Sequence, residues 1–209
     1  MTGSHRPSTC PLPLSLLCAA RQAGVALTRF IFLVDVQSQQ AWLAERSWRC
    51  MLFPPRFSAD TPFIALHDHY RMRRRIRCST SKFGISQIFG SNGTPLGLHR
   101  IAQKIGGGWP VGTVFRGRRP VGFTWHGEPG APIAHRILWL EGLQDGFNRG
   151  GNVDSFRRYI YVHGTGEEPT LGRPASHGCI HLSADDLLPL YRQLPLGTLV
   201  WIAERLTAR

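Results

Sequence analysis

Short runs of β-branched and aromatic residues, separated by glycine and proline, recur along this chain of 209 residues. Its 23 glycines and 15 prolines exceed the average share of these residue types, and both interrupt regular structure. Such a pattern is typical of many short strands joined by turns. Because 42% of the residues are apolar, the chain can build one packed core, and its length suits one domain. We therefore expect a mainly β domain, folded as a sandwich or partial barrel.

Several runs are predicted as strands from their β-branched and aromatic content. They are residues 30–36, 40–45, 71–79, 98–106, 111–115, 135–143, 155–164 and 197–204. In residues 71–79 arginine occupies every second position, which indicates an edge strand with a basic outer face. One helix is predicted in the C-terminal half, at residues 183–194, because Ser183 can cap it and its leucines share one face.

The domain proper is predicted to span residues 30–209, behind an N-terminal arm or signal segment at residues 1–29. The apolar run 10–20 ends in Cys-Ala-Ala, which resembles a cleavage site, but two prolines interrupt it; the alternative is a poorly ordered arm. Residues 46–70 are rich in proline and are predicted as an insertion. No window holds the roughly 18 apolar residues that a membrane-spanning helix needs, so no transmembrane segment is expected.

The chain is strongly basic, with 25 lysines and arginines against 13 acidic residues and a net charge of +12. An anionic partner is therefore expected: nucleic acid, a lipid headgroup or an anionic cell-wall polymer. Nucleic acid ranks last, because no motif that combines aromatic and basic residues accompanies the charge.

Four residues that can bind metal or act in catalysis crowd the sequence YVHGTGEEPTLGRPASHGCIHL: His163, His177, Cys179 and His181. A metal site is one interpretation, because alternate residues of an extended segment share one face. However, the spacing matches no standard zinc signature. A buried structural thiol at Cys179 is a second interpretation, because free cysteines are commonly buried.

A cysteine nucleophile is the third interpretation, and it needs a base, a group that orients the base, and donors for an oxyanion. Cys179 would supply the sulfur and His163 the base, at the end of a predicted strand. The carbonyl of Gly164 could hold the imidazole N–H and fix its tautomer. The backbone N–H groups of Gly178 and Cys179 would form the oxyanion hole.

At this point the sequence resembles a known family. His163-Gly164-Thr165, followed by Ser176-His177-Gly178-Cys179-Ile180, is similar to the signature of the L,D-transpeptidase (YkuD-type) catalytic domain. The stretch CSTSKFG…NGTPLGLHRI (78–101) resembles the family's strand and turn upstream of the site, and DDLLPLYRQLPLGTLVWI its helix and closing strand. The resemblance covers roughly residues 30–203 and implies a β-sandwich-like fold.

The resemblance also implies a reaction and its partners. Cys179 would attack a peptidoglycan stem tetrapeptide, release its terminal D-Ala and form a thioester, which an amine acceptor resolves. It implies acylation of the cysteine by carbapenems, a location in the periplasm or cell envelope, and no metal or organic cofactor. With water as acceptor the enzyme would be an L,D-carboxypeptidase, and a catalytically weak peptidoglycan-binding module is a further alternative.

The sequence departs from the family pattern two residues after the cysteine, where His181 stands in place of an arginine. Ser176, His177 and His181 are expected to contact the substrate. A guanidinium can pair bidentately with a carboxylate, whereas His181 would donate one hydrogen bond, or bind a carboxylate as an imidazolium at lower pH.

Overall fold

The computed structural model describes residues 12–47 and 70–206, and in this part of the chain strands outnumber helices. The strands are β1 (Phe30–Asp35), β2 (Gln40–Arg46), β3 (Tyr70–Arg77), β4 (Gly97–Ile105), β5 (Thr113–Arg116), β6 (Arg119–Phe123), β7 (Ala134–Gly142), β8 (Tyr161–Gly164), β9 (Ile180–Leu182) and β10 (Leu199–Ala203). The α-helices are α1 (Leu14–Gln22) and α3 (Ala184–Gln193), and two short 3-10 helices cover Gly151–Val153 and Glu168–Thr170. The predicted mainly β class is confirmed.

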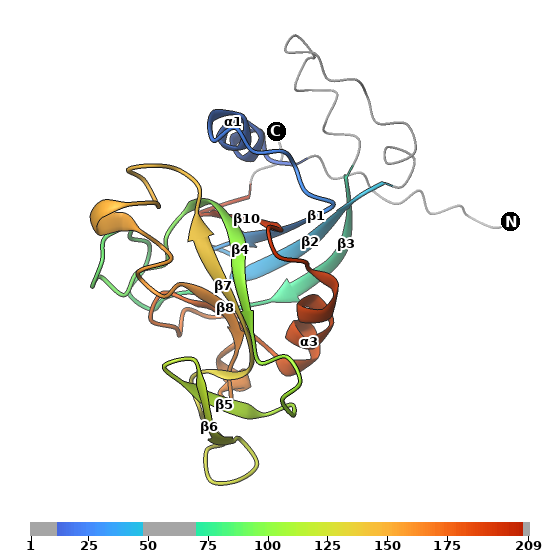
Figure 1. Ribbon diagram of the computed structural model, residues 1–209, viewed down its shortest axis with the longest axis vertical. Coiled ribbons are helices and arrows are strands. Elements are labelled where there is room, and N and C mark those ends of the chain that lie inside the picture. Colours follow the sequence, from blue (N-terminus) through green and yellow to red (C-terminus); the bar gives the residue numbers. More distant parts are fainter. Residues whose placement is uncertain (1–11, 48–69, 207–209) are drawn as a thin grey trace, which may run out of the picture.

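All of these strands belong to one mixed sheet (Figure 1). Its main order is β3-β2-β1-β10-β4-β7-β5-β6, while β8 pairs with β7 on one side and with β9 on the other. Two pairs are parallel, β1 with β10 and β8 with β9, and the remaining pairs are antiparallel. The parallel β8–β9 pair places residues 161–164 beside residues 180–182, and the candidate site is built on it.

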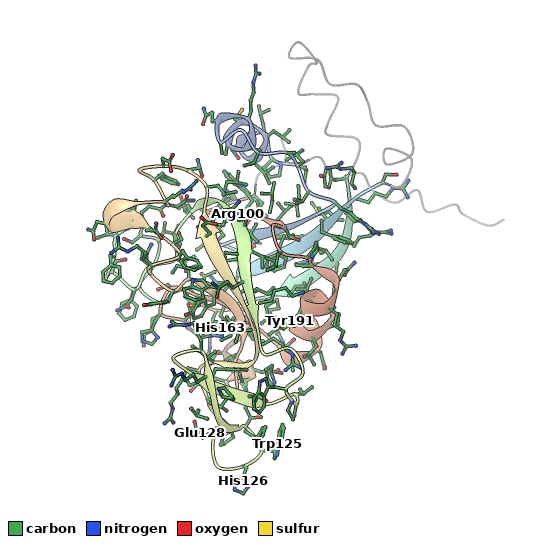
Figure 2. All side chains as sticks on the ribbon, in the orientation of Figure 1. Arg100, Trp125, His126, Glu128, His163 and Tyr191 are labelled. Atoms are coloured by element: carbon green, nitrogen blue, oxygen red, sulfur yellow. The ribbon has the colours of Figure 1, made fainter. Side chains whose placement is uncertain are left out.

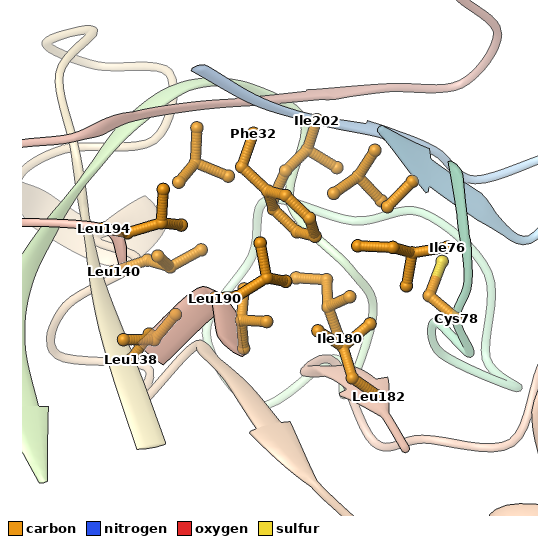
Figure 3. Packing of buried hydrophobic residues seen from close by; sticks show 14 of the residues in the cluster. Phe32, Ile76, Cys78, Leu138, Leu140, Ile180, Leu182, Leu190, Leu194 and Ile202 are labelled. Carbon is orange, nitrogen blue, oxygen red and sulfur yellow. The ribbon is translucent and has the colours of Figure 1, made fainter. Parts of the chain in front are cut away.

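Buried side chains of β1 alternate between two hydrophobic cores, one on each face of the sheet. Phe32 points into the larger core, where Figure 3 shows it with Leu190 of α3 and Ile202 of β10. Ile31 points into the smaller core, which α1 covers with Leu17. Fully burying a side chain of this size stabilises the folded state by about 1.5–3 kcal/mol. The packing of α1 and α3 against opposite faces of the sheet therefore stabilises the domain.

Helix α1 falls within residues 1–29, which the sequence predicts as an arm or signal segment. Its buried residues Leu16, Leu17, Ala19 and Ala20 share one helical face and pack into the smaller core. The expectation of a poorly ordered arm is therefore wrong for the described residues 12–29, because this apolar face is covered by the sheet. The role as an export signal stays a prediction.

Helix α3 follows the sequence closely. Ser183 is its N-cap, and its hydroxyl accepts the backbone N–H of Asp186 at 3.2 Å. Leu187 and Leu190 are buried on one face, as predicted. The strands predicted at residues 30–36, 40–45, 98–106, 135–143 and 197–204 are also confirmed, with ends shifted by at most two residues.

Two predictions around the site are wrong in detail. Residues 155–160 form turns rather than the first half of a strand, and β8 begins only at Tyr161. The Asp154 carboxylate accepts hydrogen bonds from the backbone N–H groups of Gly150 and Arg157. These bonds stabilise turns and compete with the backbone pairing of a β-strand. In addition, the short strand predicted at residues 111–115 is one half of a hairpin, whose second strand is β6.

Among the described strands, β3 lies at the edge of the sheet, as predicted, and pairs with β2. Two of its arginines form ion pairs: Arg73 with Glu45 at 2.8 Å, and Arg74 with Asp186 of α3 at 2.6 Å. Arg46 and Tyr70 are register partners at the end of β2 and the start of β3. The predicted insertion therefore connects two neighbouring strands, and residues 48–69 lie outside the described part of the chain.

Candidate active site

The neighbouring parallel strands β8 and β9 carry the residues that the sequence singles out for chemistry. Their register pairs His163 with His181 and Val162 with Ile180. Because Val162 and Ile180 are buried in the larger core, the residues that alternate with them point to the opposite face of the sheet. His163, His181 and Cys179, which immediately precedes β9, therefore share one face. Figure 2 shows His163 near the middle of the molecule.

The thiol of Cys179 is partly buried and contacts the backbone of two tyrosines. The N–H of Tyr161 donates to Sγ at 3.4 Å, and the S–H donates to the carbonyl oxygen of Tyr159 at 3.4 Å. Burial raises the pKa of the thiol to about 11, although the Tyr161 N–H and the Arg158 guanidinium both favour the thiolate. The resting site therefore holds a neutral thiol at pH 7.

The imidazole of His163 is fixed in one tautomer. It is 1% exposed, and its Nδ1 lies 2.8 Å from the carbonyl oxygen of Gly164. A carbonyl oxygen can only accept, so Nδ1 carries the proton and Nε2 keeps a lone pair. Burial lowers the pKa of His163 to about 4, more than the bond to Gly164 raises it, and the ring is neutral at pH 7.

Gly164 is required at its position for steric reasons as well as for its carbonyl group. A Cβ atom built there would lie 2.4 Å from Cδ2 of His135 and 2.7 Å from the carbonyl oxygen of Ala134. Both distances are shorter than real Cβ contacts, so any side chain would displace the end of β8.

His181 lies against His163, with ring centroids 4.6 Å apart. Burial, together with the nearby His163 and His177 rings, lowers the pKa of His181 to about 3. The ring is therefore neutral at pH 7 and can donate or accept one hydrogen bond at each nitrogen, while a carboxylate contact by an imidazolium at lower pH stays a prediction. His177 is exposed, and its ring contacts Phe83 with centroids 5.4 Å apart.

Ser176 organises the loop before the cysteine rather than facing a substrate. It is 0% exposed, and its hydroxyl donates to the carbonyl oxygen of Cys179 at 2.6 Å. The same hydroxyl accepts the N–H of Gly178 at 3.2 Å. The expected substrate contact by Ser176 does not fit this burial. The Gly178 N–H is also held within the loop, which leaves the N–H of Cys179 as the expected oxyanion donor.

Gly178 has a positive φ of 116°, a conformation that side chains disfavour. A Cβ atom there would lie 3.2 Å from the carbonyl oxygen of Gly93, in the loop that precedes β4. The carbonyl of Gly178 accepts the hydroxyl of Thr94 at 3.1 Å, and the N–H of Ser176 donates to Thr80 at 3.0 Å. Two upstream segments, both within residues 78–101, thus hold the loop that carries Cys179.

Arg158 is a functional candidate that the motif does not reveal. Its guanidinium is half-buried and donates to the carbonyl oxygens of Ser86, Gln87 and Gly93 at 2.7–3.0 Å. Its positive charge also favours the thiolate form of Cys179. Arg158 comes from the turn region that the sequence predicts as strand, so its direction could not be inferred from strand alternation.

The metal interpretation finds no geometric support in the described residues. Within 12–47 and 70–206, no group of three or more His, Cys, Asp or Glu side chains is arranged to hold an ion. Three free cysteines, Cys18, Cys78 and Cys179, lie in the same part of the chain. Burial raises the pKa of Cys78 to about 12, which makes that thiol unreactive.

Comparison with known proteins places these features in a family. The family model of the L,D-transpeptidase catalytic domain (YkuD) matches residues 61–202. The chain is 32% identical over 78 residues to "Putative L,D-transpeptidase YqjB" of Bacillus subtilis (strain 168), a match that covers 37% of this chain and 39% of that protein.

Solved structures resemble the fold. The structure of Bdellovibrio bacteriovorus Bd1075 superposes with a TM-score of 0.51 at 12% identity, covering 96% of this chain and 54% of that one. An L,D-transpeptidase from Mycobacterium smegmatis gives a TM-score of 0.42 at 16% identity, covering 84% of this chain and 58% of that one. The chain thus spans 39–58% of the length of these proteins.

The described helices are too short and too polar to cross a membrane. The family match extends over more than half of the chain and includes β3 to β10, with both strands of the site. The chain therefore belongs to the family of L,D-transpeptidase catalytic domains.

Proposed function

We propose that this protein is a cysteine-dependent L,D-transpeptidase that remodels peptidoglycan stem peptides. The observation that carries the proposal is the placement of His163 and Cys179 on one face of the parallel β8–β9 pair. His163 is held in the tautomer whose Nε2 can accept a proton.

In the first half-reaction, Sγ of Cys179 attacks the carbonyl carbon between the third stem residue and the terminal D-Ala. Since the thiol and the imidazole are both neutral at rest, Nε2 of His163 takes the thiol proton as the carbon–sulfur bond forms. The N–H of Cys179 would stabilise the oxyanion. The same proton then passes to the D-Ala amine as the carbon–nitrogen bond breaks, and a thioester remains.

In the second half-reaction, an acceptor amine attacks the thioester carbonyl and gives its proton to His163. The new amide bond forms, the carbon–sulfur bond breaks, and the proton returns to Cys179. Water as acceptor would release a tripeptide and make the protein an L,D-carboxypeptidase. Peptidoglycan as substrate implies a location in the cell envelope.

Mass spectrometry of the intact protein tests the first half-reaction. Incubation with a stem tetrapeptide is expected to release D-Ala and leave one thioester adduct per molecule, and a carbapenem is expected to give one stable adduct. Cys179→Ala should bind the tetrapeptide and form no adduct. Release of D-Ala by this variant would overturn the proposal. Binding by the wild type without adduct or D-Ala would indicate a peptidoglycan-binding module instead.

The role of His163 is tested separately. His163→Ala is expected to slow acylation by on the order of 10²-fold or more if the imidazole acts as the base. His126→Ala is the matched control, because His126 is exposed and Figure 2 shows it at the far end of the molecule. Equal acylation rates for the two variants would contradict a base at position 163.

A further inference from the structure

A cavity of about 340 Å³ lies beside the nucleophile, and neither the motif nor the proposed chemistry assigns it a role. Aromatic rings and two guanidinium groups line it: Phe89, Arg118, Trp139, Phe156, Arg157 and Tyr159. Its volume lies within the range of about 300–1,000 Å³ that is typical of sites for small ligands. Its lining is therefore both apolar and strongly positive.

The cavity adjoins Cys179 through two of its lining residues. The carbonyl oxygen of Tyr159 accepts the S–H of Cys179 at 3.4 Å. Trp139 belongs to the hydrophobic cluster against which Cys179 packs, and it is the register partner of Tyr161. A peptide whose carbonyl carbon reaches Sγ would therefore extend along or into this cavity.

Arg118 enters the cavity from the turn between β5 and β6. Its guanidinium lies 4.9 Å from the ring centroids of both Trp139 and Tyr159, and donates to the hydroxyl of Tyr161 at 3.5 Å. A guanidinium has five N–H groups, and stacking on a ring leaves its edge open for an acceptor.

The backbone of Arg118 is in an unfavourable conformation. Gly117 and Arg118 have φ angles of 54° and 70°, and a two-residue hairpin turn of this kind needs positive φ at both positions. Glycine or asparagine is the usual residue there, so a bulky arginine costs conformational energy. The contacts of its guanidinium with Trp139 and Tyr159 hold it in place, and such strain is concentrated at functional sites.

The charge of the cavity is not neutralised from within the described part of the chain. Neither Arg118 nor Arg157 is among the ion pairs formed by residues 12–47 and 70–206. Among the residues that line the cavity, the positive charge available to a ligand therefore comes from Arg118 in the β5–β6 turn and from Arg157.

We infer that Arg118 determines specificity by binding a carboxylate of the donor peptide in this cavity, over the aromatic floor of Trp139 and Tyr159. This inference rests on the proposed function, and it names the chemical class of the donor: a peptide that carries a free carboxylate close to the bond that is cleaved. The strained turn supplies the guanidinium of Arg118, which can bind a carboxylate through two hydrogen bonds, whereas strand β9 supplies the imidazole of His181.

Binding to the Cys179→Ala variant, measured by calorimetry, tests the inference without turnover. Three stem tetrapeptides are compared: one with all carboxylates free, one amidated at the terminal carboxylate and one amidated at the internal carboxylates. At least one amidation is expected to weaken binding roughly 10- to 100-fold, the range for a hydrogen bond to a charged group. Adding Arg118→Gln should remove that difference, whereas Arg118→Lys should keep part of it.

Arg119→Gln is the matched control, because Arg119 lies on the same hairpin, is exposed and does not line the cavity, yet its loss changes the net charge equally. It should leave the effect of amidation unchanged. An amidation effect that persists in Arg118→Gln, or that is absent before the substitution, overturns the inference. Thioester formation by the wild type is scored separately: its absence counts against the proposed function alone, even where carboxylate-dependent binding remains.

Discussion

His163 and His181 face each other across β8 and β9, with ring centroids 4.6 Å apart. Burial lowers the pKa of His163 to about 4; burial, together with repulsion from the His163 and His177 rings, lowers that of His181 to about 3, so both imidazoles are neutral at pH 7. The Cys179 thiol next to them is also neutral. The resting site therefore contains no thiolate–imidazolium ion pair, and its reactivity should depend on pH accordingly.

The alkylation of Cys179 by iodoacetamide should rise with pH over a wide range. Because only the thiolate reacts and the pKa of the thiol is raised to about 11, the rate should increase about tenfold per pH unit from pH 7 to pH 10. Peptide mapping by mass spectrometry separates Cys179 from the exposed Cys18. A rate that is already constant below pH 8 would reveal an ion-paired thiolate.

Removing the charge of Arg158 should slow the same reaction. Its guanidinium stabilises the thiolate of Cys179, so Arg158→Gln should raise the pKa of the thiol further and lower the alkylation rate at pH 8. Arg119→Gln is the matched control, because it removes the same charge from an exposed residue that does not line the cavity beside Cys179. Identical rates for the two variants at pH 8 would show that position 158 acts only by holding the loop at residues 86–93.

The folded protein should lose stability as the pH falls from about 6.5 to about 4. His99 and His163 are 0% and 1% exposed, and burial lowers the pKa of each from 6.5 to about 4. Between these values the unfolded chain binds more protons than the folded one, so the free energy of unfolding rises with pH. His181, whose pKa is lowered to about 3, contributes in the same direction, so these three histidines give a slope of up to about 4 kcal/mol per pH unit.

Urea denaturation at pH 7.0, 5.5 and 4.5 measures this slope. His163→Gln should reduce the slope by about a third, since one proton fewer of three is taken up on unfolding. Stability that does not change between pH 6.5 and 4.5 would mean that these rings are protonated in the folded state.

Gly178→Ala should destabilise the protein and slow acylation. The substitution meets an unfavourable φ of 116° and places Cβ 3.2 Å from the carbonyl oxygen of Gly93. Gly150→Ala provides the control, because its φ is 77° but nothing lies within 4 Å of the added Cβ. Both should lose about 1–3 kcal/mol because their positive φ angles lie where side chains are disfavoured, measured by urea denaturation. Only Gly178→Ala should lose more and show slower thioester formation.

Ser176→Ala should impair the site beyond its effect on stability. It removes the hydroxyl that joins the carbonyl of Cys179 to the N–H of Gly178, at a cost of about 1–3 kcal/mol for buried groups left unpaired. Ser183→Ala removes the N-cap of α3 and should cost about 1 kcal/mol. If the two variants acylate equally fast, Ser176 is dispensable for the position of the nucleophile.

The sequence was sufficient to predict the elements whose residues carry a strong local signal. Strand β1, with its continuous apolar run, and helix α3, with the Ser183 cap, were predicted almost to the residue. The tautomer of His163 could also be anticipated, because Gly164 is its neighbour in sequence and supplies the carbonyl.

What sequence reasoning missed depends on contacts between distant segments or on unusual turn residues. Strand β6 was missed because Gly117-Arg118 is an atypical hairpin turn. The aromatic and β-branched content of residues 155–164 predicted a strand, but the Asp154 side chain stabilises turns there. The substrate role expected of Ser176 was inferred from its place beside the nucleophile, whereas the fold buries its side chain.

The parallel pairing of β8 with β9 fixes how His163 lies relative to Cys179 independently of the chain that joins them. Residues 165–179 cross from one strand to the other, and Glu167, Glu168, Gly172 and Arg173 are exposed along the way. Since the ladder rather than this connection sets the position of His163 relative to Cys179, a protease cut among the exposed residues should leave two fragments that remain associated. The nicked protein would then carry His163 and Cys179 on separate polypeptides.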